Sequence, residues 1–61
     1  MKFLFLVQWM LIRKGDIIDR GTKGVVARDG TEAWRKVYSH EDVPAGAKCR
    51  SITEMGQIDI L

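Results

Sequence analysis

The run that opens the chain reads Phe3-Leu4-Phe5-Leu6-Val7-Gln8-Trp9-Met10-Leu11-Ile12, and nine of its ten residues are apolar. Side chains alternate between the two faces of a strand, so an extended run of this kind is apolar on both faces. One face would carry Phe3, Phe5, Val7, Trp9 and Leu11, and the other Leu4, Leu6, Met10 and Ile12. A strand that is apolar on both faces needs cover on both. We expect the rest of the chain to cover one face, which leaves the second face for a partner or a second copy.

The chain has 61 residues, with one cysteine and one histidine. A chain this short forms one small domain, residues 1–61, and buries only about 60% of the surface that its unfolded form exposes. Cys49 cannot form an internal disulfide, and Cys49 with His40 cannot complete a closed zinc site, which takes four ligands. We therefore expect no cofactor and no metal, and support from a partner or from homo-oligomerisation through the first strand. A lone cysteine also indicates a reducing compartment, which would be the cytoplasm, or the host cytoplasm if the protein is viral.

The charges are interleaved, with ten basic and eight acidic residues and a net charge of +2. A nucleic-acid-binding protein usually has a concentrated basic stripe, so we expect nucleic-acid binding to be weak at best. Stacking aromatics beside basic side chains would support the alternative of a nucleic-acid-binding accessory protein. The residues in question are Trp9, Trp34 and Tyr38 with Arg35, Lys36 and Arg50. Lys2 before an apolar run resembles a signal peptide, but the run is far shorter than the ~20 residues that span a bilayer, so we expect no membrane partner.

A second extended segment covers residues 17–27 and contains Gly21 and Gly24. Glycine inside a strand often marks a bulge or a sharp bend, so we expect one there. The hairpin turn lies either at Lys14-Gly15 or near Asp19-Arg20-Gly21, and the sequence leaves both places open.

A helix is predicted from about Gly30 to His40. Asp29 can cap its first turn. Glu32 stands at the capping-box spacing, at which its carboxylate can accept a hydrogen bond from the backbone N–H of the capping residue. The residues Ala33, Trp34, Val37 and Tyr38 form one apolar stripe at helical spacing. The helix is too short to persist alone and forms because it docks on the sheet.

The chain after the helix is predicted to be extended again. Val43-Pro44-Ala45-Gly46 ends the helical region, and a strand over 48–53 would place Cys49 and Ser51 on one side. Residues 54–57 suggest a turn, and residues 58–61 a short fourth strand. The predicted class is α+β, a small, mainly antiparallel sheet with one helix on one face, in the order strand-strand-helix-strand.

No residue cluster indicates catalysis, so we expect no enzyme activity and no catalytic residue. His40 stands between Ser39 and Glu41, but neighbours in sequence do not converge as a catalytic triad does. We interpret His40 as a solvated residue at the helix end. Cys49 is interpreted as a small buried hydrophobe.

From Val26 to Ile52 the chain resembles a family of small early proteins of short-tailed lytic coliphages. The resemblance rests on an extended segment that ends in Ala27, on Glu32-Ala33 in a short helix, and on Val43-Pro44-Ala45-Gly46 before the last strand. It implies a small sheet with one helix, and a phage protein of host takeover that binds and inhibits bacterial RNA polymerase.

The functional residues of that family match only in part. The family uses two arginines on the strand after its Val-Pro-Ala-Gly segment, and those places hold Ser51 and Thr53 here, with Arg50 adjacent. Of the family's acidic helix strip only Glu32 has a match, because Arg35 and Tyr38 stand where acids would be expected.

The candidate partner-binding residues are Lys48, Arg50, Glu32 and Arg35. Lys48 and Arg50 would share one strand face and could engage one acidic patch, since the arginine fork binds carboxylates with two hydrogen bonds. The predicted function is a small non-enzymatic protein that binds and inhibits a host macromolecule, with a nucleic-acid-binding accessory or a structural homo-oligomer subunit as the alternatives.

Overall fold

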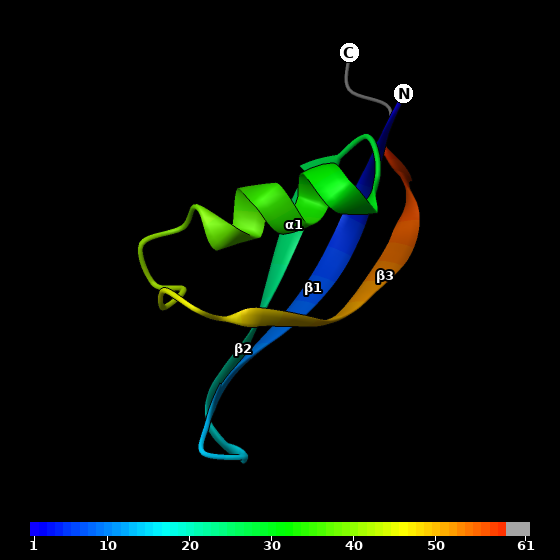
Figure 1. Cartoon of the computed structure of the whole chain (residues 1–61). Coiled ribbons are helices and arrows are strands. Elements are labelled where there is room, and N and C mark those ends of the chain that lie inside the picture. The colour runs from blue at the N-terminus through cyan, green and yellow to red at the C-terminus, as the bar shows by residue number, and fades with distance from the viewer. Residues whose placement is uncertain (59–61) are drawn as a thin grey trace.

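The computed structural model describes residues 1–58 and places the apolar opening run in the middle of a three-stranded sheet. β1 (Lys2–Arg13) lies between β2 (Asp16–Ala27) and β3 (Lys48–Ile58), and both pairings are antiparallel. The helix α1 (Gly30–Tyr38) crosses one face of this sheet (Figure 1). The predicted α+β architecture, one helix on one face of an antiparallel sheet, is confirmed.

The core lies between α1 and the odd-numbered residues of β1. Val7 and Val37 are fully buried, and Phe5 and Trp9 are each 6% exposed. The helix adds Ala33, which is also fully buried. Burial contributes about 1.5–3 kcal/mol for each large apolar side chain, which is why a helix of nine residues stays folded here.

The hairpin turn between β1 and β2 is formed by Lys14 and Gly15. Their φ angles are 54° and 83°, both in the left-handed region. Positive φ at both central residues is the geometry of a type I′ turn, whose twist matches that of the strands on either side. The alternative turn near Asp19-Arg20-Gly21 is wrong, because β2 continues through those residues.

The glycines of β2 do not form the bulge that the sequence suggested. The bulge in β2 lies at Ile18, nearer the turn, so the prediction for Gly21 and Gly24 is wrong. Gly21 instead makes room for an aromatic ring, because a Cβ at this position would stand 2.6 Å from Cζ2 of Trp9.

β3 is longer than predicted. Residues 54–57, predicted as a turn, belong to the strand, so that prediction is wrong. β3 pairs with β1 along residues Lys2 to Met10 of β1. Two bulges in β3 leave Arg50 and Met55 without a partner on β1. Pairing with a long central strand overrides the local turn signal of Gly56. No separate fourth strand occurs within residues 1–58, and the rest of that predicted segment, 59–61, lies outside the described residues.

The first bulge of β3 changes which side chains share a face. Cys49 pairs with Trp9 and Ser51 pairs with Gln8, so Cys49 and Ser51 lie on opposite faces and their predicted common side is wrong. Cys49 and Ile52 both pack against the core. The extra residue between the pairs shifts the alternation by one position, which a strict two-residue period does not anticipate.

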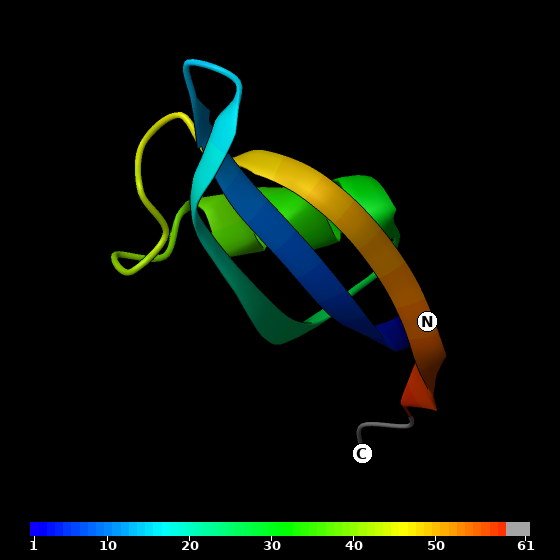
Figure 2. The ribbon, with the colours of Figure 1, turned by 90° about the horizontal axis from the view of Figure 1, so that it is seen from below.

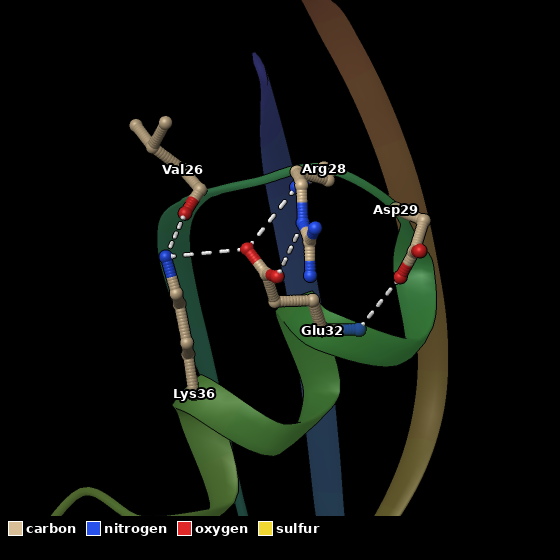
Figure 3. Close-up of polar contacts among 5 residues, drawn as sticks. All are labelled: Val26, Arg28, Asp29, Glu32 and Lys36. Atoms are coloured by element: carbon tan, nitrogen blue, oxygen red, sulfur yellow. Dashed lines mark hydrogen bonds and ion pairs between the residues drawn. The ribbon is translucent and has the colours of Figure 1, made fainter. Parts of the chain in front are cut away.

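α1 ends at Tyr38, two residues before the predicted end at His40. Its cap is the predicted one, since the Glu32 backbone N–H donates to Asp29 Oδ1 at 2.8 Å. The return bond differs from the prediction. The Glu32 carboxylate accepts one hydrogen bond from the Arg28 backbone N–H at 3.2 Å and one from the Arg28 Nε–H at 2.9 Å (Figure 3). The cap is thereby tied to the connection from β2.

Candidate functional site

No part of residues 1–58 covers the face of the sheet away from α1. In Figure 2 the helix lies behind the sheet, and no other described element lies in front of it. Leu4 and Ile12 of β1 are 38% and 40% exposed on this side, and Leu6 and Met10 are half-buried. We call this surface the open face and define it by the even-numbered residues of β1 with their partners on β2 and β3.

Residues directly opposite each other in an antiparallel pair share a face, so the register defines the open face. From β2 it takes Ile17, Arg20, Thr22, Gly24 and Val26, and from β3 it takes Lys48, Ser51, Thr53, Gly56 and Ile58. Leu4, Leu6 and Val26 make the half near the start of β1 mostly apolar, with Lys2 at its edge. At the half near the hairpin, Met10 lies between Arg20 and Lys48, whose Cα atoms are about 10 Å apart by the spacing of strands.

The open face carries cations and no carboxylate among residues 1–58. Lys2, Arg20 and Lys48 lie on it by register. Asp16, Asp19 and Glu54 pair with odd-numbered residues of β1, which face the other side. The other described acids belong to the helix and its flanks: Asp29, Glu32, Glu41 and Asp42. The acids of residues 1–58 therefore all lie off the open face, whereas the cations lie on both sides of the sheet.

Charge pairing differs between the two sides of the sheet. On the helix side Lys23 Nζ lies 2.7 Å from Asp42 Oδ2, and Glu32 pairs with Arg28 and Lys36 at 2.9 and 3.5 Å. Within residues 1–58, by contrast, the cations of the open face form no ion pair. On the helix side three cations, Lys23, Arg28 and Lys36, are therefore paired with carboxylates of the same chain.

The four residues predicted to bind a partner fall into two groups. Lys48 lies on the open face, and Arg50 is the extra residue of the adjacent bulge. Glu32 and Arg35 lie on α1, across the sheet. The structure therefore does not bring the four together. Arg20 was missed, because a regular register from the turn at Lys14-Gly15 would set it opposite Trp9, and the bulge at Ile18 moves it opposite Met10.

Glu32 is occupied by contacts within the chain. The hydrogen bonds from Arg28 hold the pKa of its carboxyl below the ordinary value. Lys36 Nζ lies 3.5 Å from Glu32 Oε1 and also donates to the Val26 carbonyl at 2.7 Å (Figure 3). This network joins the helix to the end of β2, so Glu32 serves the fold.

A depression lies on the helix side, between β2 and the segment after α1. Its lining includes Lys23, Lys36, His40 and Asp42. Lys23 is paired with Asp42, and His40 Nδ1 stands 3.7 Å from the same carboxylate. No group of three His, Cys, Asp or Glu suited to a metal ion occurs within residues 1–58. No helix in this part of the chain is long and apolar enough to cross a membrane.

Comparison with known proteins identifies no relative: no protein-family model, curated protein or solved structure matches the chain. The resemblance to the phage inhibitor family therefore stays a prediction.

Proposed function

We propose that the protein is a non-enzymatic binding module of the cytoplasm, which holds an acidic, partly apolar surface of another protein on its open face. The observation that carries this proposal is the composition of the face: cations and apolar side chains, with no carboxylate among the described residues. Charge complementarity speeds association and selects partners, and the apolar half provides area to bury.

A protein fits the open face better than a nucleic acid does. Sequence-tolerant binding of single strands uses aromatic side chains as stacking platforms. Phe3, Phe5 and Trp9 all point to the helix side, where Trp34 also packs. In the half of the open face around Leu6 the register places Lys2 as the one cation of the described residues, and the other side chains there are mainly aliphatic, so few phosphates could be neutralised.

A partner of opposite charge also fits better than a second copy. Two open faces brought together with their hairpin ends aligned would place Arg20 and Lys48 of one copy against the same cations of the other, and like charges at an interface are costly. We therefore favour an acidic partner over a homodimer at this surface.

Bacterial RNA polymerase is the first partner to test, because the sequence resemblance points to it, and inhibition would follow from occupancy of its surface. The experiment is biolayer interferometry with immobilised polymerase. Lys48→Glu and Arg35→Glu form a matched pair, because both residues are exposed, both variants change the net charge equally, and they lie on opposite sides of the sheet. We expect Lys48→Glu to weaken binding and Arg35→Glu to leave it nearly unchanged. Arg50→Ala should weaken binding to the polymerase by about 1–3 kcal/mol, the range for a charged hydrogen bond.

Four outcomes would count against the proposal. Absence of binding at tens of micromolar would exclude polymerase as the partner. Equal weakening of binding by both charge reversals would exclude the open face as the binding surface. A gel shift with sub-micromolar affinity at physiological salt would favour the nucleic-acid alternative instead. Sedimentation of a dimer that Leu6→Glu converts to a monomer would favour self-association.

A further inference from the structure

Two arginines from different strands line one depression on the open face. The depression, about 370 Å³, is lined by Gln8, Trp9, Arg20, Gly21, Thr22 and Arg50. On the helix side the Trp9 ring covers Gly21, so the depression opens on the face where Gln8, Arg20 and Thr22 lie. The bulge of β3 thereby brings Arg50 to the same hollow as Arg20, although the two are thirty positions apart in sequence.

The polar side chains of this hollow are hydrogen-bond donors. Guanidinium groups donate and cannot accept, and the Thr22 hydroxyl can donate. The Ser51 hydroxyl donates to Gln8 Oε1 at 3.0 Å, which turns the amide oxygen of Gln8 to Ser51 and leaves its NH₂ group to donate elsewhere. No carboxylate of residues 1–58 lines the hollow. Such a lining suits an anion.

We propose that this hollow binds a single carboxylate side chain, an Asp or Glu of the protein held on the open face, and the proposal rests on the function proposed above. Arginine forks match the planar carboxylate with paired hydrogen bonds, and two forks can hold one carboxylate from two sides. The half-buried Met10 follows Gln8 on the same face of β1, so apolar surface for the neighbouring residues of a peptide begins beside the hollow.

The test uses the free protein and a carboxylate probe, so it does not depend on the identity of the partner. Sodium glutarate is titrated at constant ionic strength while the Nε–H signals of the arginines are followed by NMR. We expect saturating shifts of Arg20 and Arg50, with a dissociation constant on the order of 1–10 mM. Arg20→Gln should weaken binding about tenfold, whereas Arg35→Gln on the helix should change it less than about twofold.

Each opposite result would overturn the subsite. Equal shifts of Arg35 and Arg50 would mean unspecific ion pairing, and equal shifts with the neutral analogue glutaramide would mean that charge is not recognised. Inorganic phosphate bound about tenfold more tightly than glutarate would make phosphate the preferred anion and contradict the carboxylate assignment. If glutarate does not bind but polymerase does, the carboxylate subsite is excluded and the proposed function stands. If glutarate binds but polymerase does not, the subsite stands and polymerase is excluded as the partner.

Discussion

Replacing Gly21 with alanine should destabilise the fold although it adds only one methyl group. The ideal position of that methyl carbon lies 2.6, 2.7 and 2.8 Å from Cζ2, Cε2 and Nε1 of Trp9. These atoms belong to a rigid ring that is 6% exposed and packed in the core, so it cannot rotate away. Overpacking of this kind costs about 1–3 kcal/mol.

That cost is large for a chain of this size. With 61 residues and roughly 0.05–0.15 kcal/mol per residue, the total stability is about 3–9 kcal/mol. At about 4–8 °C per kcal/mol for a small domain, Gly21→Ala should lower the Tm by roughly 4–24 °C. Urea denaturation followed by circular dichroism gives the free energy directly.

Gly24→Ala is the matched control, because it lies on the same strand and its nearest contact would be Leu4 Cδ1 at 4.0 Å. Both alanines reduce the entropy of the unfolded chain alike, so the difference between the variants isolates the clash. In a Trp9→Phe background the same Gly21→Ala change should cost less than about 1 kcal/mol, since phenylalanine lacks the indole atoms involved. Equal stability of Gly21→Ala and Gly24→Ala would refute the packing argument.

Three further predictions concern the helix and the thiol. Asp29→Ala should lower the unfolding free energy by about 0.5–2 kcal/mol through loss of the cap, and Asp29→Asn should recover most of it in the same melts. The hydrogen bonds from Arg28 lower the Glu32 pKa, so this group stabilises the fold above the ordinary pKa of 4.5 and loses that effect as the pH falls through the lowered value. Below pH 4.5 the unfolding free energy of Glu32→Gln should therefore fall less steeply with decreasing pH than that of the unchanged protein. Identical slopes would contradict the assignment. Burial raises the Cys49 pKa, so iodoacetamide at pH 8 should alkylate the folded protein more slowly than the unfolded chain, and equal rates would mean an accessible thiol.

Trp9 illustrates how packing compromises a polar group. Its Nε1 is buried and has no hydrogen-bond partner among the described residues. An unsatisfied buried donor costs about 1–3 kcal/mol, which offsets part of the gain from burying the ring. Within the described residues the Trp9 ring therefore stabilises the fold through its shape and buried area over Gly21.

Local patterns were enough to predict much of the fold. The density of apolar residues in 3–12 predicted a strand with two apolar faces, because burial scales with apolar area and a strand alternates its side chains. Asp29 and the stripe through Val37 predicted a short capped helix docked on that strand. These features depend on neighbours within a few residues, which is the range over which sequence periodicity carries information.

The assembly of the open face required the three-dimensional pairing. Single extra residues at Ile18, Arg50 and Met55 shift the register, and each shift moves all later side chains of its strand to the other face. For that reason the predicted common side of Cys49 and Ser51 failed, and Arg20 was not recognised as a neighbour of Arg50. Interleaved charges become a cationic face only when long-range antiparallel pairing sorts them, because a strand does not specify by itself which residue of another strand stands opposite.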